Sequence, residues 1–196
     1  MEVLHLFPTD IYFSETDIDN KNISRIILKK EKEEQTIFNT NSGGWQSDQW
    51  LHQDKRFSKI ISTLENKFKQ IFNDNNYTDD LVVGIDSMWA NVNRYRDSNL
   101  PHTHDPSDWS FVYYVKIPED SGNLVMCDPR IRKGSKWGIQ NFYKKITNHF
   151  AADLFTLPPV LGRLIIFPSY LEHYVTENKT DKPRISISGN IKMEKP

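Results

Sequence analysis

Cysteine is almost absent from this chain of 196 residues, which contains only Cys127. A single thiol excludes an intramolecular disulfide and a zinc site built from several thiolates. No apolar run approaches the roughly 20 residues that a membrane-spanning helix needs. The first ten residues lack the basic start and the apolar stretch of a signal peptide. We therefore expect a cytoplasmic protein that has no membrane partner.

An excess of charge of one sign is also missing. The 25 Lys and Arg residues balance 26 Asp and Glu residues, which gives a net charge of -1. Such a balance creates no global field that would attract a nucleic-acid backbone or an anionic membrane surface. The composition therefore argues against a nucleic-acid partner. It leaves a small-molecule substrate, a peptidyl substrate and a homodimer open.

Internal repeats and linkers rich in glycine or serine are absent as well, so we interpret residues 1–196 as a single domain. Residues 1–80 are expected to form an N-terminal arm, with an edge strand at 3–13, and supporting helices. One helix is predicted within 17–35. A second is predicted at 57–72, where apolar residues recur at helical spacing and should pack on a sheet.

Residues 81–191 change to the pattern of strands separated by turn residues. The predicted strands cover residues 82–95, 109–117, 123–127, 162–168, 173–176 and 185–191. Residues 40–53 are predicted to be a loop, and residues 131–159 a less regular insertion. Helices that precede a run of strands favour a mainly β (α+β) protein, with the helices packed on a β-sandwich or barrel.

Histidines at two separated places are candidates for a metal site. His102 and His104 lie two residues apart, and alternate residues of a strand face the same side. On a strand, Thr103 and Asp105 would face the other way. His173, about seventy residues later, would complete a facial set of three nitrogen donors and leave other positions open. Imidazole suits Fe, Zn, Cu and Ni, so the ligand type alone does not select the metal.

A third segment, Arg184-Ile185-Ser186, follows His173 by eleven residues and begins a strand of alternating Ile and Ser. Arg184 and Ser186 therefore share one face of this strand. A planar guanidinium on a buried face can bind both oxygens of a carboxylate. The three segments together predict a metal ion with an anion held beside it.

These segments resemble the 2-oxoglutarate- and Fe(II)-dependent oxygenases. The resemblance covers residues 89–191. It rests on Asn91-Val92-Asn93-Arg94-Tyr95, Pro101-His102-Thr103-His104, Ser110-Phe111-Val112-Tyr113-Tyr114-Val115, Gly162-Arg163-Leu164-Ile165-Ile166-Phe167-Pro168 with His173, and Pro183-Arg184-Ile185-Ser186-Ile187-Ser188. Phe7-Pro8 and Asp128-Pro129-Arg130 are similar to motifs of a small bacterial and phage group of this superfamily.

The resemblance implies a double-stranded β-helix, which is a jelly-roll or cupin-like barrel, over about residues 80–191. It implies a dioxygenase, a hydroxylase by expectation, with Fe(II), 2-oxoglutarate and O2 as cofactors. In that family the arginine of the R-x-S segment, here Arg184, binds the far carboxylate of 2-oxoglutarate, and Ser186 can donate a hydroxyl to it. Asn93, Tyr95 or Tyr114 could add a further hydrogen bond.

One position departs from the family pattern, because His104 stands where the family carries a carboxylate ligand. Three interpretations stay open. His102, His104 and His173 form the metal site; or His102 and His173 bind iron with water as the third ligand; or a bulge lets His104 and Asp105 approach the metal. A cupin-like metal- or ligand-binding module without redox chemistry is the alternative function. A metal-independent phage structural protein would require the histidines to be accidental.

Overall fold

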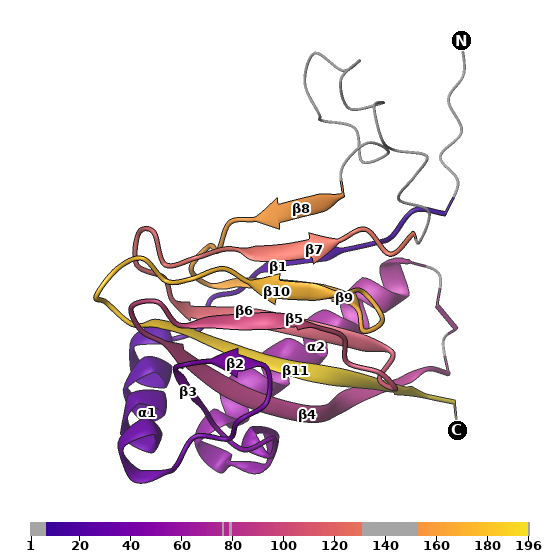
Figure 1. Ribbon diagram of the computed structural model, residues 1–196. Helices are drawn as coiled ribbons and strands as arrows, with labels where there is room; N and C mark the ends of the chain where they lie inside the picture. The colour runs from indigo at the N-terminus through magenta and orange to yellow at the C-terminus, as the bar shows by residue number, and fades with distance from the viewer. Residues whose placement is uncertain (1–6, 76, 79, 131–152, 196) are drawn as a thin grey trace.

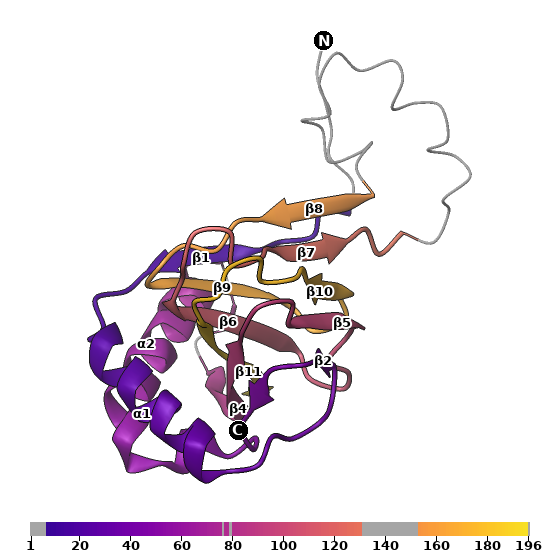
Figure 2. The ribbon, with the colours of Figure 1, turned by 60° about the vertical axis from the view of Figure 1, so that its left-hand side comes forward.

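Two antiparallel β-sheets face each other in this protein, and two helices cover the outer side of the larger sheet (Figures 1 and 2). The computed structural model describes residues 7–195 except 76, 79 and 131–152. In spatial order, the larger sheet contains β1 (Tyr12–Glu15), β9 (Arg163–Pro168), β6 (Trp109–Lys116), β11 (Arg184–Glu194), β4 (Val82–Asn93) and β3 (Trp45–Gln46). The smaller sheet contains β2 (Asn41–Ser42), β5 (Ser98–His102), β10 (His173–Val175), β7 (Leu124–Cys127) and β8 (Leu154–Leu157).

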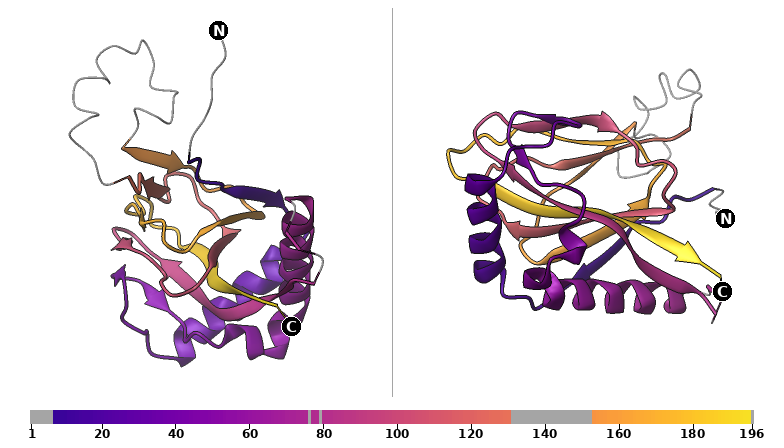
Figure 3. Two further views of the ribbon diagram at one scale, coloured as in Figure 1. Left: turned by 90° about the vertical axis from the view of Figure 1, so that its right-hand side faces the viewer. Right: turned by 90° about the horizontal axis from the view of Figure 1, so that it is seen from below.

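Both predicted helices are present, as α1 (Asn20–Glu33) and α2 (Ser58–Asp74), and short 3-10 turns at Leu51–Gln53 and Lys55–Phe57 precede α2. The Asp19 side chain accepts a hydrogen bond from the Asn22 backbone N–H and so caps the start of α1. The buried face of α2 recurs every four residues and consists of Ile60, Leu64, Phe68 and Phe72. Figure 3 shows both helices on the outer side of the larger sheet. No helix in the described part of the chain has the length and apolar composition to cross a membrane.

Side chains that alternate along β11 point either into the apolar core or into a pocket. Ile185, Ile187 and Ile191 are buried in the apolar core between the larger sheet and the helices. Arg184 and Ser186 occupy the alternate positions and line a pocket between the two sheets. A second apolar cluster fills the rest of the space between the sheets, and it includes Val112, Tyr114, Leu124, Met126, Ile165 and Phe167. The larger sheet therefore supplies one wall of the pocket, and the helices support that wall from behind.

Removal of a core ring under the sheet should destabilise the fold strongly. Phe68 of α2 is completely buried, and its ring centroid lies 5.3 Å from that of Phe111 on β6. We expect Phe68→Ala to lower the free energy of unfolding by about 3–5 kcal/mol, since such a change loses burial and leaves a cavity. Chemical denaturation measures this. The exposed neighbour Lys69 provides the control, and Lys69→Ala should change stability by less than about 0.5 kcal/mol. Equal losses for the two variants would contradict this packing.

The N-terminal segment contributes more strands than its sequence predicts. β1 lies at the edge of the larger sheet, as expected for the arm, but starts at Tyr12. The predicted loop at 40–53 contains β2 and β3, and each is only two residues long. β2 pairs with β5 and β3 pairs with β4, so both form through partners that are distant in sequence. Of the irregular insertion predicted at 131–159, residues 131–152 lie outside the described residues. The part that is described contains β8, which pairs with β7.

Candidate metal centre

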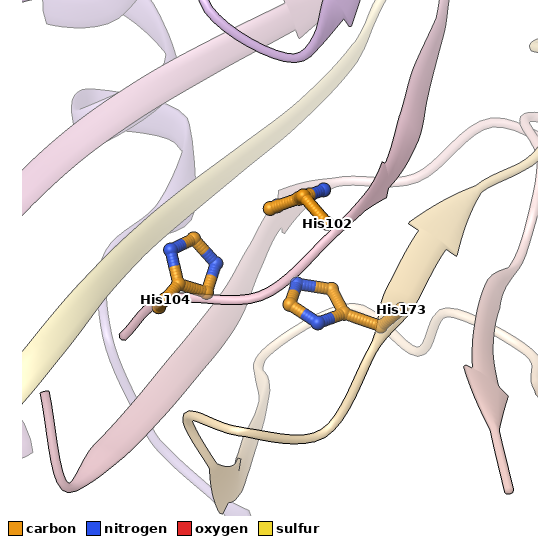
Figure 4. Close-up of side chains that lie close together, drawn as sticks. All are labelled: His102, His104 and His173. Carbon is orange, nitrogen blue, oxygen red and sulfur yellow. The ribbon is translucent and has the colours of Figure 1, made fainter. Parts of the chain in front are cut away.

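Three histidines converge at one end of the space between the sheets. His173 is the first residue of β10, and its paired neighbour on β5 is His102, the last residue of that strand. His104 follows in the loop after β5. One ring nitrogen from each histidine lies within 4.8 Å of the other two, and Figure 4 shows the three rings gathered around a common point. Three donors bound to one ion at about 2.0–2.2 Å lie roughly 3–3.5 Å from one another, so the rings would approach by up to about 2 Å when an ion binds.

Hydrogen bonds orient two of the three rings. The Nδ1 atom of His102 lies 2.6 Å from the Leu100 carbonyl oxygen, and the Nδ1 atom of His173 lies 2.9 Å from the Leu171 carbonyl oxygen. A carbonyl can only accept, so Nδ1–H is the donor in both rings. The lone pair is then on Nε2, which is free to bind a metal.

The rings are neutral near neutral pH, which is the form that binds metal. Burial lowers the pKa of His104 to about 3 and, with smaller contributions from the other two imidazoles, keeps this ring uncharged. Burial and the neighbouring His102 lower the pKa of His173 to about 4. The pKa of His102 is also lowered, again chiefly by burial. Three neutral nitrogen donors therefore face one point.

The loop after β5, rather than strand alternation, brings His104 to this point. β5 ends at His102, and the His104 backbone N–H donates to the Ser169 carbonyl oxygen at 2.9 Å. Asp105 is exposed, and its carboxylate accepts a hydrogen bond from the Thr103 hydroxyl at 3.2 Å. Within the described residues, the group that could hold a metal ion consists of the three histidines and contains no carboxylate.

Arg184, the first residue of β11, lies in the same pocket as the histidines and is only 3% exposed. Its terminal nitrogens donate to the Ser121 carbonyl oxygen at 3.2 Å and to the Asn93 Oδ1 at 2.9 Å. Its Nε is buried without a partner, and no carboxylate of the described chain forms an ion pair with it. Burial lowers its pKa to about 10, so the group remains charged. A buried cation without an anion is costly, and this one can accept an anionic ligand.

The other predicted cofactor residues divide into two groups. Ser186 and Tyr114 are buried and line the pocket. Burial raises the pKa of Tyr114 to about 12, so its hydroxyl keeps its proton. Asn93 is buried and orients Arg184. Tyr95 lies past the end of β4, is 58% exposed and carries the Arg96 guanidinium 5.4 Å from its ring centroid, so it does not reach the pocket.

On β4, two pocket residues were not singled out from the sequence as site residues. Trp89 and Asn91 line the pocket from β4, on the same face as Asn93. Asn91 pairs with Ser186 across the sheet, and its buried Oδ1 has no hydrogen-bond partner in the part of the chain that the structure describes. The alternation of positions 89, 91 and 93 along a predicted strand was the signal that could have identified both.

The family follows from a comparison of the sequence with protein-family profiles. The family described as "Putative 2OG-Fe(II) oxygenase", where 2OG is 2-oxoglutarate, matches residues 87–190, slightly more than half of the chain. The chain belongs to this oxygenase family. The matched residues include the three histidines, Arg184 and the strands that carry them. No curated protein matches the sequence.

Solved structures of similar fold include three enzymes of this kind. A prolyl-4-hydroxylase from Pseudomonas putida has a TM-score of 0.62 at 14% identity, over 94% of this chain and 92% of that one. The viral collagen prolyl hydroxylase of Paramecium bursaria Chlorella virus-1, in its 2OG complex, has a TM-score of 0.55 at 13% identity, over 92% and 95% of the two chains. The epimerase SnoN, in complex with Fe3+, α-ketoglutarate and nogalamycin RO, has a TM-score of 0.64 at 10% identity, over 94% and 79%. These similarities confirm the predicted double-stranded β-helix fold.

The oxygenase is therefore an enzyme that uses Fe(II), 2-oxoglutarate and O2, as its family does. Its pocket suits these cofactors. Neutral imidazoles are suitable ligands for iron, and the group of three leaves coordination positions for other ligands. The buried Nε of Arg184, which has no hydrogen-bond partner among the described residues, provides a donor for a carboxylate.

Proposed function

We propose that this oxygenase is a hydroxylase in which His102, His104 and His173 hold Fe(II) while Arg184 binds the far carboxylate of 2-oxoglutarate. The observation that carries the proposal is the charged, buried Arg184, which forms no ion pair with a carboxylate of the described residues and shares a pocket with the three histidines. When bound, iron, 2-oxoglutarate and O2 supply the oxidation: one oxygen atom enters a substrate C–H bond, and 2-oxoglutarate loses CO2 and takes the other oxygen as succinate.

The chain's own part in this chemistry is to orient the reactants. The carbonyls of Leu100 and Leu171 fix the rings of His102 and His173, so that their Nε2 lone pairs are available before the metal arrives. Asn93 accepts from the Arg184 guanidinium and restricts its rotation. Ser186 lies on the same strand face as Arg184, and its hydroxyl can donate to the same carboxylate.

The pocket walls also exclude water from the reacting groups. Trp89, Val112, Leu124 and Phe167 supply apolar surface around the histidines and Arg184. Charge-assisted hydrogen bonds are stronger in such a low-dielectric environment than in water. Tyr114 stays a neutral donor there because its pKa is raised to about 12. This environment suits a carboxylate ligand that is chelated at one end and bound by a guanidinium at the other.

A thermal-shift experiment separates this proposal from a metal-binding module without redox chemistry. A ligand that binds only the folded state raises the melting temperature. We expect Mn(II) alone to give a small rise, and 2-oxoglutarate to add a further rise only when Mn(II) is present. Stabilisation by the metal but none by 2-oxoglutarate would favour the module. With Fe(II) and O2, the hydroxylase should also release succinate and produce compounds one oxygen atom heavier in a substrate-containing lysate.

Substitution at His104 tests the proposed third ligand. We expect His104→Asp to retain or strengthen Fe(II) binding, because a carboxylate adds a negative charge beside the cation, whereas His104→Ala should weaken it. Isothermal titration with Fe(II) under anaerobic conditions measures both. Asp105→Asn is the matched control and should leave the affinity unchanged, since Asp105 is exposed and bonded to Thr103. Equal losses in His104→Asp and His104→Ala would contradict the proposal, and wild-type affinity in His104→Ala would favour water as the third ligand.

A further inference from the structure

The three histidines are held in different ways. His102 and His173 each donate a hydrogen bond from Nδ1 to a backbone carbonyl. His104 differs, because its ring forms no hydrogen bond with any residue that the structure describes. Its surroundings are other rings instead: the centroids of His102, His173 and Trp89 lie 4.8, 5.0 and 5.6 Å away. Ring packing is therefore the constraint on the orientation of the His104 imidazole.

The backbone of Trp89 is held by hydrogen bonds on both sides of its strand. Its backbone lies in the middle of β4, between β11 on one side and the segment at Ser47–Trp50 on the other. Both of its chain neighbours are tied to that segment. The Met88 N–H donates to the Gln49 carbonyl oxygen at 2.9 Å, and the Ala90 N–H donates to the Ser47 hydroxyl at 3.0 Å. Trp89 as a residue is only 9% exposed, so little of the indole faces solvent.

The side chain of His104 is the less constrained partner in its contact with Trp89. It lies in the loop that follows β5, and the loop is attached to the end of β9 by the bond from the His104 N–H to the Ser169 carbonyl oxygen. That bond places the backbone but leaves rotation of the side chain free. The indole, whose ring plane is tilted by 45° to that of the imidazole, limits this rotation. Without it, the imidazole would gain rotamers that point away from His102 and His173.

We propose that Trp89 is the positioning residue for His104, and that its indole replaces the hydrogen bond that orients each of the other two histidines. This inference rests on the proposed three-histidine centre. Its physical basis is preorganisation: a ligand held in one rotamer loses less side-chain entropy when it binds the ion. Removal of the indole should weaken metal binding only through His104, whereas a general role in folding would weaken it regardless of His104.

A double-mutant cycle on metal affinity tests the proposal without turnover. Mn(II) dissociation constants would be measured by titration calorimetry for wild type, Trp89→Leu, His104→Ala and the double variant. We expect Trp89→Leu to weaken Mn(II) binding about tenfold, the size typical of residues that support a metal ligand. In the His104→Ala background, the same change should have almost no effect. A loss of equal size in both backgrounds, or no loss in either, would overturn the proposal.

Two further variants keep the result interpretable. Trp89→Phe retains an aromatic ring of smaller area, and we expect an intermediate loss of affinity that again requires His104. This variant carries the test if Trp89→Leu does not fold, and unchanged affinity in it would then overturn the proposal. Leu64→Ala removes buried core surface on α2, outside the pocket, and should lower stability while leaving Mn(II) affinity unchanged. Wild-type Mn(II) affinity in His104→Ala would contradict the proposed three-histidine centre itself. A loss there with none in Trp89→Leu would overturn only the role of Trp89.

Discussion

Arg184→Ala should weaken 2-oxoglutarate binding by at least about 100-fold and leave metal affinity nearly unchanged. The expected size follows from the site, because an anion that loses its charge-assisted partner in a buried pocket is left unpaired at a cost of several kcal/mol. The metal affinity should persist because the hydrogen bonds of Arg184 go to Ser121 and Asn93 and not to the histidines. Titration of 2-oxoglutarate into the Mn(II)-loaded protein measures the first quantity, and titration of Mn(II) measures the second.

Two other arginine variants sharpen this test. Arg184→Lys should recover only part of the affinity for 2-oxoglutarate, because an ammonium cannot contact both carboxylate oxygens in the fork geometry of a guanidinium. Arg163→Ala is the matched control, since Arg163 bonds to Glu15 at the exposed edge between β1 and β9. It should bind 2-oxoglutarate as wild type does. If Arg184→Ala did so too, the assignment of Arg184 would be wrong, and the metal-binding module without redox chemistry would become the better interpretation.

His173→Ala should abolish Fe(II) binding or weaken it severely. His173 is buried, its ring is fixed by the Leu171 carbonyl, and it lies between the other two histidines and Phe167. Its loss leaves at most two nitrogen donors, one from the last residue of β5 and one from the loop that follows it. No described carboxylate is placed to replace it. The effect should exceed that of His104→Ala, because the hydrogen bond of His173 makes it the better-oriented ligand.

Metal content after anaerobic loading with Fe(II) and removal of free metal measures this loss. His52→Ala is the matched control. His52 lies in a 3-10 turn before α2 and is not part of the histidine cluster, so that variant should retain wild-type metal content. Near-ultraviolet circular dichroism would verify that His173→Ala keeps its tertiary structure. A folded His173→Ala protein with unchanged metal content would exclude the proposed site.

Part of this architecture could be read from the sequence because it depends on local pattern. The spacing of apolar residues from Phe57 to Phe72 determined α2, whose buried residues share one face. Alternation determined that Arg184 and Ser186 share the face of β11 opposite Ile185 and Ile187, and the structure buries all four. Alternation every two residues in a strand and burial every four residues in a helix are properties of a single element. They can therefore be predicted without knowing which elements it packs against.

The short strands and their partners could not be predicted from alternation, because they depend on strand pairing in the folded protein. β2, β3 and β8 are short. β2 and β3 pair with strands that are distant in sequence, and β8 pairs with β7, from which a long connection separates it. Propensity over two to four residues is too weak to predict such strands. The same limit applied to the pocket. Asn93 reaches Arg184 because β4 pairs with β11 in a register that places the two opposite each other, whereas Tyr95 lies past the end of that pairing.

The sequence by itself determined which side chains were available for the site: the imidazoles of His102, His104 and His173 and the guanidinium of Arg184. Only the tertiary structure decided how they meet. The pairing of β5 with β10 sets His102 opposite His173, and a bond to Ser169 turns the loop so that His104, rather than Asp105, joins them. The packing of Trp89 against His104 also belongs to this level. The residue type of a ligand is set at one position of the sequence, but the orientation of its side chain depends on backbone hydrogen bonds to segments tens of residues away.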